Sequence, residues 1–294
     1  MKPTANVKTI PRTKQIARMK WTLNPVLAWR RTRGRFRDPL FVYQMGKVGS
    51  TTIEETLEAR YRYYHLHNRA DFSSKYEPYR VSRRTRGAEY FDIITAVRDP
   101  LARKISCFFQ HLAVHPVVNP VAEYPFCFES VEAAQNAGMD ELIARFHAFD
   151  DGVREATEWF DRHFEPATGI RIYDHGFDPE KGWQIFREAK WRVLVLRFED
   201  IKKNYLDALN EFVVERYGEP SRVDRLWPAN LSSRKWYFDL MHEFRQNIRF
   251  SETDIDAAYN TPYARYFYSD QELTNMRSKW RRVSTSSASV DRNH

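Results

Sequence analysis

The sequence of 294 residues has little cysteine and no long apolar run, and each shortage excludes a class of protein. Two cysteines, Cys107 and Cys127, are too few for a disulfide scaffold or a four-ligand zinc site. No stretch approaches the roughly 18–20 apolar residues that a bilayer-spanning helix needs. The apolar run Val26 to Trp29 is too short for the core of a signal peptide. We therefore expect a globular, cytoplasmic protein.

Acidic residues are absent from the first 37 residues, which carry eleven Lys or Arg, although the formal net charge of the whole chain is only +8. Residues 277–294 carry five basic residues and one acid, whereas residues 38–276 hold 31 basic and 38 acidic residues. Because the basic excess sits at the ends, the composition argues against a nucleic-acid-binding module. Residues 1–37 are interpreted as a basic extension that is either solvated or in peripheral contact with an anionic membrane.

Strand-like and helix-like segments alternate between residues 38 and 282, which predicts one α/β domain. We expect a central, mainly parallel sheet and a helical C-terminal half. A serine-rich stretch marks residues 283–294 as a disordered tail. Predicted strands are Leu40–Gln44, Tyr61–Leu66, Phe91–Val97 and Arg192–Arg197, with Gly169–Phe177 as one arm of a hairpin; predicted helices are Thr52–Arg60, Leu101–Ala113, Met139–Phe149, Val153–Phe164, Tyr205–Glu215, Arg234–Arg245, Asp254–Asn260 and Asp270–Trp280.

A glycine-bearing loop, Gln44-Met45-Gly46-Lys47-Val48-Gly49-Ser50-Thr51-Thr52, joins the first strand to the first helix. Glycines let backbone N–H groups surround an anion, and a helix N-terminus adds partial positive charge. The lysine and the hydroxyl groups suit a phosphate or sulfate ester. The lysine precedes the second glycine, so the loop is not a standard P-loop. An ordinary turn with Ser/Thr capping is the alternative interpretation.

A second polar element, Arg98-Asp99-Pro100, stands at the end of a buried strand, where ligands of open α/β sheets bind. Pro100 can open a helix, and Ser106 then lies about two turns into it. Arg98 and Ser106 together could hold a second phosphate. The alternative is structural, with Asp99 as an N-cap and Arg98 in a salt bridge.

The two elements together resemble the two signatures of P-loop sulfotransferases, which use 3′-phosphoadenosine-5′-phosphosulfate (PAPS). Arg98-Asp99-Pro100 with Arg103 and Ser106 is most similar to the carbohydrate sulfotransferase branch. In addition, Arg234-Lys235-Trp236-Tyr237 resembles the Asn-Lys-Trp-Tyr-Ser element of bacterial capsular polysaccharide synthesis proteins, with Arg234 in place of Asn and Phe238 in place of Ser.

This resemblance implies an α/β, P-loop-like three-layer domain, a donor, an acceptor and a set of site residues. The donor would be PAPS, no metal is expected, and the acceptor would be a hydroxyl or amine of a carbohydrate in a capsular or cell-surface polysaccharide. A bacterial cytoplasmic enzyme, with the inner membrane as a peripheral location, fits this role. Lys47 would neutralise the bridging oxygen as it leaves, Arg98 and Ser106 would hold the 3′-phosphate, and the 5′ side would be held by Gly46, Lys47, Val48, Gly49, Ser50, Thr51 and Thr52.

A base should deprotonate the acceptor, and histidine suits this role near neutral pH. His65 and His67 close the second strand, and strand alternation puts both on one face. We predict that one of them is the base, although either could be structural. Further candidates, in order of preference, are Glu54, Glu55, His111 and His115.

The stretch Leu196-Arg197-Phe198-Glu199-Asp200 resembles a stretch common in sulfotransferases and is interpreted as structural, with its acids capping the next helix. A Walker-B strand presenting a Mg²⁺ ligand is the rival, and a P-loop nucleotide kinase-like enzyme is the matching alternative function. A non-catalytic capsule-assembly protein on the same fold is the other alternative. Trp236 and Tyr237 are interpreted as core residues. The arginines at positions 80, 83, 84 and 86 either are solvated or face an anionic acceptor.

Overall fold

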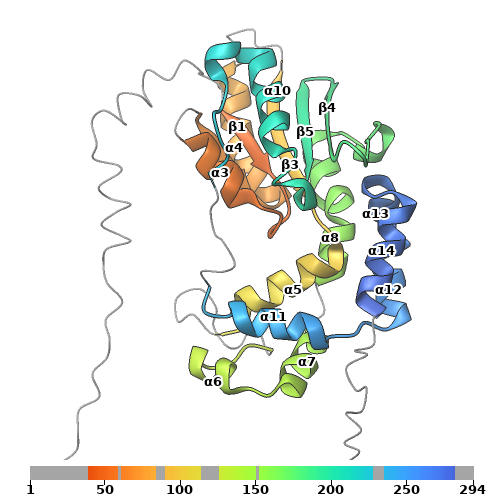
Figure 1. The fold of residues 1–294 in the computed structure, drawn as a ribbon. Coiled ribbons are helices and arrows are strands. Elements are labelled where there is room, and N and C mark those ends of the chain that lie inside the picture. Colours follow the sequence, from red (N-terminus) through yellow and green to blue (C-terminus); the bar gives the residue numbers. More distant parts are fainter. Residues whose placement is uncertain are drawn as a thin grey trace, which may run out of the picture.

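The structure is a computed structural model, and it describes residues 39–58, 61–83, 90–113, 126–149, 152–227 and 235–281. The predicted extension, residues 1–37, and the predicted tail, residues 283–294, lie outside these ranges, as do Arg84, Arg86, His115 and Arg234. A five-stranded sheet occupies one end of the described domain, and a group of helices extends from its edge (Figure 1). Within these ranges no helix is long and apolar enough to cross a membrane.

The sheet is mainly parallel, as predicted, and has the order β2-β1-β3-β5-β4. Four strands, β1 (Leu40–Tyr43), β2 (Tyr63–Leu66), β3 (Phe91–Val97) and β5 (Trp191–Arg197), run parallel, whereas β4 (Trp183–Glu188) is antiparallel at one edge. The chain leaves β1 toward β2 on one side and leaves β3 toward β5 on the other. The carboxyl ends of β1 and β3 therefore form a topological switch point, where α/β sheets bind ligands.

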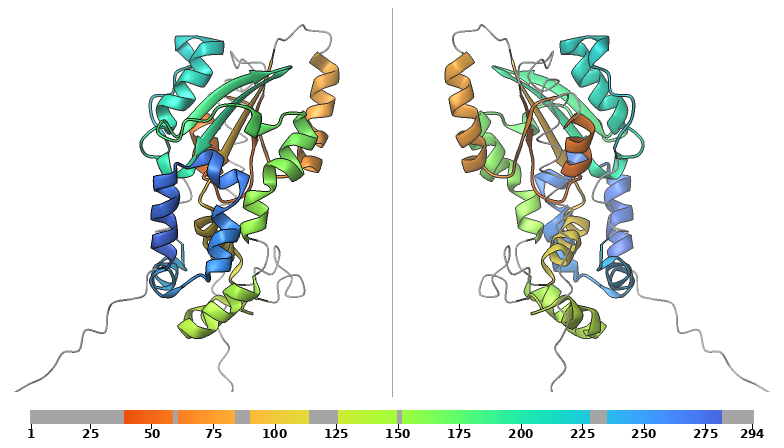
Figure 2. Two further views of the ribbon diagram at one scale, coloured as in Figure 1. Left: turned by 90° about the vertical axis from the view of Figure 1, so that its right-hand side faces the viewer. Right: turned by 90° about the vertical axis from the view of Figure 1, so that its left-hand side faces the viewer.

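Helices cover both faces of the sheet, which confirms the three-layer arrangement (Figure 2). One face carries α3 (Ser50–Glu58) and α10 (Tyr205–Tyr217). The other carries α4 (Arg69–Arg83) with the helical run α8 (Gly152–Thr157), η2 (Phe160–Phe164) and α9 (Glu165–Thr168). On this second face the ring of Tyr43 contacts Phe72 and Trp159, at centroid distances of 4.5 and 5.0 Å. Alternating side chains of fully buried strands supply both layers of the core.

The helical half begins with α5 (Pro100–His111), whose N-terminus is capped by the carboxylate of Asp99. It continues with α6 (Val131–Asn136), α7 (Met139–Ala148), α11 (Phe238–Asn247), α12 (Glu252–Tyr259), α13 (Pro262–Phe267) and α14 (Asp270–Arg281). Tyr259 and Trp280 from these last helices donate to the same Asp99 carboxylate, at 2.8 and 3.3 Å. Asp99 therefore ties the C-terminal helices to the end of β3.

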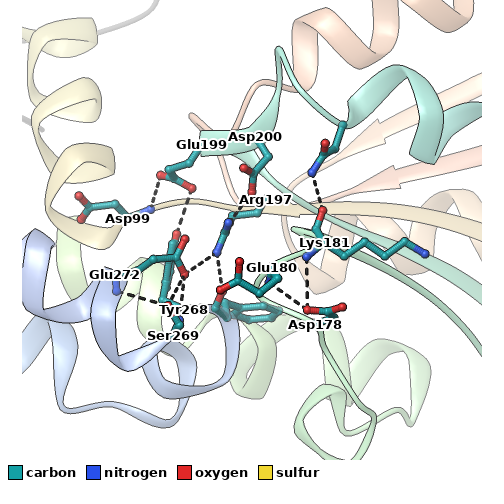
Figure 3. A network of polar contacts seen from close by, with 12 residues as sticks. Asp99, Asp178, Glu180, Lys181, Arg197, Glu199, Asp200, Tyr268, Ser269 and Glu272 are labelled. Atoms are coloured by element: carbon teal, nitrogen blue, oxygen red, sulfur yellow. Dashed lines mark hydrogen bonds and ion pairs between the residues drawn. The ribbon is translucent and has the colours of Figure 1, made fainter.

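A second polar network holds the C-terminal helices against the end of β5 (Figure 3). The Arg197 guanidinium donates to Asp200 at 2.6 Å and to Glu272 of α14 at 2.8 Å. Glu199 accepts from the backbone N–H of Asp99 at 2.9 Å and from the hydroxyl of Tyr268 at 3.2 Å. These contacts are structural, but the two acids do not cap α10: the residue before that helix is Asn204, which makes no side-chain cap.

Two further expectations were wrong. Gly169–Phe177 contains the short 3₁₀ turn η3 (Ile172–Asp174) and no strand, and the hairpin is instead formed by β4 and β5. The polar stretch Asp71–Glu89, for which the sequence predicted no helix, begins inside helix α4, which contains Pro78. Phe72 and Tyr76, four residues apart, give α4 a narrow buried stripe, and the polar residues around them concealed this pattern.

A buried ionic cluster joins the amino-terminal ends of β3 and β5. The carboxylate of Asp92, with only 1% of the residue exposed, lies 2.9 Å from Nε of Arg192, which is 2% exposed. From α10, Arg216 approaches the same carboxylate at 2.6 Å, and the Tyr217 hydroxyl donates to it at 2.9 Å. Asp92 thus pairs with two cations at the edge of the sheet opposite the glycine-bearing loop, and Glu215 of α10 places a second carboxylate 3.4 Å from Nη1 of Arg192.

Candidate active site

The loop after β1 and the element after β3 are in direct contact. Nη1 of Arg98 donates to the carbonyl of Lys47 at 2.9 Å. Nε of Arg103, which is buried, donates to the carbonyl of Gly46 at 2.8 Å, and its Nη1 donates to Gly152 at 3.0 Å. The two sequence elements that we predicted to act together are therefore joined, and the arginines hold the loop by its carbonyl groups.

These bonds use only the carbonyl groups of the loop, so its N–H groups can still bind a ligand. Among the described residues, none accepts a hydrogen bond from the N–H groups of residues 46–51. Lys47 itself has a φ of 71°, and Gly49 has a φ of 87°. A Cβ on Gly49 would lie 2.8 Å from the ring of Phe198, so glycine is required there. This conformation, followed by the N-terminus of α3, is suited to an anion.

The side chain of Lys47 has no acidic partner. It is partly exposed and makes no hydrogen bond or ion pair with any residue of the described ranges. Burial lowers the pKa of Lys47 to about 8, and the charges of Arg98, Lys235 and Arg103 add to the shift. The Lys47 ammonium thus lies in the field of three further cations at the switch point, and an anionic ligand would compensate it.

Hydroxyl groups and unused guanidinium N–H groups surround this cluster. The side chains of Ser50, Thr51, Thr52 and Ser106 make no hydrogen bond within the described part of the chain. Arg98 lies over the ring of Phe198, 4.3 Å from its centroid, and its side-chain bonds to the protein use Nη1 alone. These are the donors that the sequence assigns to a 5′ and a 3′ anionic group.

His67 lies next to the loop. Its Nδ1 is 3.1 Å from the carbonyl oxygen of Gln44, at the start of the loop. Because a carbonyl can only accept, Nδ1 carries the hydrogen and Nε2 of the neutral ring has the free lone pair. Partial burial and the neighbouring His65 lower the pKa of His67, which keeps the ring neutral at pH 7. His67 therefore presents a proton-accepting nitrogen.

His65 occupies a more enclosed position on the α3 face of the sheet. Its Nδ1 is 2.9 Å from the carboxylate of Glu54 of α3, and its ring meets that of His67 edge-on at 4.3 Å. Nε2 of His65 is buried and has no hydrogen-bond partner in the described residues. Of the two histidines, His67 is thus the one that an acceptor can reach.

The remaining candidate residues differ in where they lie relative to the glycine-bearing loop. His111 lies within electrostatic range of Lys47, but its Nδ1 is bound to the Cys107 carbonyl at 3.0 Å, and burial lowers its pKa. Glu55 is exposed on α3. Arg80 pairs with Glu77 at 2.7 Å near the C-terminal end of α4, which lies toward the amino ends of the strands. Arg80 is therefore at the opposite edge from the loop.

Lys235 is the residue that the sequence reasoning missed. It belongs to the Arg-Lys-Trp-Tyr element, of which only Trp236 and Tyr237 were interpreted, as core residues, and its charge acts on Lys47. Tyr237 is indeed buried and packs on Phe109 of α5, but Trp236 is 38% exposed. The resemblance to the Asn-Lys-Trp-Tyr-Ser element was the available signal, because a family-defining lysine beside aromatic residues is an unusual core component.

Comparison with known proteins gives one family match. Residues 135–269 match the model of a family described as "Putative capsular polysaccharide synthesis protein". The matched region contains Lys235, Trp236 and Tyr237 and ends before α14, whereas the Lys47 loop lies outside it. No curated protein and no solved structure matches the chain. The match indicates a connection with capsular polysaccharide synthesis.

Proposed function

We propose that the protein is a sulfotransferase that moves a sulfuryl group from PAPS to a hydroxyl or amine of a carbohydrate during the synthesis of a capsular or cell-surface polysaccharide. One observation carries this proposal: within the described residues, Lys47 has no acidic partner and the N–H groups of its loop have no acceptor, while Arg98 binds the Lys47 carbonyl. The resemblance of both elements to sulfotransferase signatures and the capsular family match support it.

The donor would extend between the two elements. The loop N–H groups and the hydroxyls of Ser50, Thr51 and Thr52 would bind the 5′-phosphosulfate, while the remaining donors of Arg98 and the hydroxyl of Ser106 would bind the 3′-phosphate. Both sets of donors are unused by the described protein, so binding would not first break protein contacts. The cations would supply charge-assisted hydrogen bonds, which are the strongest available.

Transfer would break the bond between sulfur and the bridging oxygen and form one between sulfur and the acceptor atom. The bridging oxygen keeps the electron pair, and the acceptor proton passes to a base. As in phosphoryl transfer, catalysis would consist mainly of positioning and charge stabilisation. Lys47 would neutralise the departing oxygen, and Nε2 of His67 would take the proton.

Replacement of His67 by glutamine is expected to lower the sulfation rate by about 100-fold, because general bases typically contribute that much or more. Affinity for adenosine 3′,5′-bisphosphate should not change. The matched control is His65→Gln, which should keep most of the rate, since Nε2 of His65 is buried and its Nδ1 faces Glu54. Steady-state kinetics and calorimetry measure both effects. Full activity of the His67 variant across the pH profile would mean that another residue is the base, and Glu55 and Glu54 would be tested next, followed by His111.

Replacement of Arg98 by alanine is expected to weaken adenosine 3′,5′-bisphosphate binding by roughly 10- to 150-fold, because a lost charge-assisted bond costs about 1.5–3 kcal/mol. Adenosine 5′-monophosphate binding should weaken less, through the loosened loop alone. Calorimetry with both nucleotides gives the comparison. Equal weakening of the two would mean that Arg98 acts only by holding the carbonyl of Lys47.

A further inference from the structure

Two large hydrophobic side chains in the described part of the chain are exposed, Trp227 at 47% and Trp236 at 38%. The other described tryptophans are buried, at 0 to 5% exposed: Trp159, Trp183, Trp191 and Trp280. Burial of a tryptophan side chain is among the largest hydrophobic contributions to the stability of a protein, and an exposed tryptophan does not make it. An exposed indole that is held in place is therefore a candidate contact for a ligand.

The two exposed tryptophans differ in what covers them. The guanidinium of Arg225 lies over the ring of Trp227, 3.8 Å from its centroid, so one face of that indole is already occupied. Trp236 meets Tyr237 edge-on at 5.3 Å, and within the described residues no other ring or cation lies on its faces. Tyr237 is anchored in turn on Phe109 of α5. Trp236 is thus held by Tyr237, and within the described residues it has no second aromatic or cationic partner.

Trp236 also lies beside the candidate active site. Its neighbour in the chain, Lys235, acts electrostatically on Lys47, at the sulfuryl end of the donor site. Phe109, on which Tyr237 packs, follows Ser106 by one helical turn of α5. An acceptor must approach the sulfuryl group, whereas the adenine would lie beyond the ribose at the other end of the donor.

We propose that Trp236 is the platform on which a six-membered sugar ring of the carbohydrate acceptor stacks, with the Lys235 ammonium beside that ring. This assignment of the acceptor subsite rests on the proposed sulfotransferase function. The apolar C–H face of a sugar ring matches the flat indole, while sugar hydroxyls or a carboxylate match Lys235. The match of residues 135–269 to a capsular polysaccharide synthesis family agrees with a carbohydrate ligand.

The test measures binding of two defined probes, a hyaluronan hexasaccharide and isomaltohexaose, to the full chain by calorimetry, with and without saturating adenosine 3′,5′-bisphosphate. We expect at least one probe to bind and Trp236→Ala to weaken that binding about tenfold or more, as loss of an aromatic stacking partner does. Trp236→Phe should lose less than about threefold. Trp227→Ala is the matched control and should bind as the wild type does, and nucleotide affinity should be equal in all four proteins.

The proposal that Trp236 stacks on a sugar ring would be refuted if neither probe binds the wild type. It would also be refuted if Trp236→Ala binds the probe normally. A third refuting result would be a Trp236→Ala variant with weakened nucleotide binding and intact sugar binding. The third result would place adenine on the indole. A wild type that binds no nucleotide but shows Trp236-dependent sugar binding would instead refute the sulfotransferase function and keep the sugar platform. The two hypotheses therefore fail separately.

Discussion

Replacement of Lys47 by alanine is expected to lower the turnover number for sulfation by about 10²- to 10³-fold, the typical cost of removing a group aimed at developing charge. The bridging oxygen gains negative charge only as the bond to sulfur breaks, so Lys47 acts mainly in the transition state. No acidic residue in the described ranges offsets this ammonium. Donor affinity should therefore change less than turnover.

The pH dependence of kcat/KM tests the role of Lys47 in a second way. The lowered pKa of Lys47, about 8, means that the ammonium is present below pH 8 and is lost as the pH rises through that value. The kcat/KM of the wild type for PAPS should accordingly fall on the alkaline side, beginning near pH 8. The Lys47→Ala variant should lack this decrease. Exposed Lys202 provides the control: Lys202→Ala should keep both the rate and the alkaline limb.

A Lys47→Ala variant whose turnover stays within about threefold of the wild type would remove this residue from catalysis. The melting temperature of each variant needs to be compared with that of the wild type. Because the Lys47 side chain makes no contact with the described protein beyond packing, we expect the substitution to leave the fold intact.

Replacement of Asp92 by alanine is expected to lower the free energy of unfolding by about 3–5 kcal/mol, the cost of breaking a buried ion pair from one side. The variant would leave Arg192, which is 2% exposed, without its 2.9 Å partner, and Arg216 would lose the same carboxylate. Tyr217 would also lose its acceptor. The loss should be this large because Arg192 is almost fully buried and would keep only the more distant carboxylate of Glu215, at 3.4 Å.

Urea unfolding followed by tryptophan fluorescence measures this effect as a lower midpoint with an unchanged slope. Asp256→Ala is the matched control, since Asp256 forms an exposed pair with Arg277 and should contribute less than about 1 kcal/mol. A loss of 1 kcal/mol or less for Asp92→Ala would mean that α10 relaxes around the two arginines. Nucleotide binding by the folded variant should be normal, because Asp92 lies at the amino ends of the strands.

The core strands could be predicted closely, because fully buried parallel strands are continuous apolar runs. Phe91–Val97 was predicted with the bounds of β3, and Arg192–Arg197 misses β5 by one residue. The contact between the Lys47 loop and Arg98 could also be predicted. Both elements come directly after parallel strands, and the carboxyl ends of such strands lie at the same edge of the sheet. Contacts that depend on side-chain direction were beyond the sequence: Arg103 was noted only as part of the second motif, and its bonds to Gly46 and Gly152 were not foreseen.

The choice between His65 and His67 also needed the structure. Strand alternation predicts that both lie on one face, and the contact of their rings at 4.3 Å agrees with it. Only coordinates distinguish Nδ1 of His65, facing Glu54, from Nδ1 of His67, facing a backbone carbonyl. Lys235 was missed for a related reason, since its approach to Lys47 joins segments nearly 190 residues apart in the chain.

Calorimetric titration of the full chain with adenosine 3′,5′-bisphosphate, in parallel with ATP, decides whether the site binds the PAPS nucleotide. We expect the bisphosphate to bind without Mg²⁺ and more tightly than ATP, since the loop and Arg98 offer separate 5′ and 3′ anion sites. Absence of bisphosphate binding, or tight ATP binding that strictly requires Mg²⁺, would refute a PAPS-dependent sulfotransferase and favour a nucleotide kinase-like enzyme.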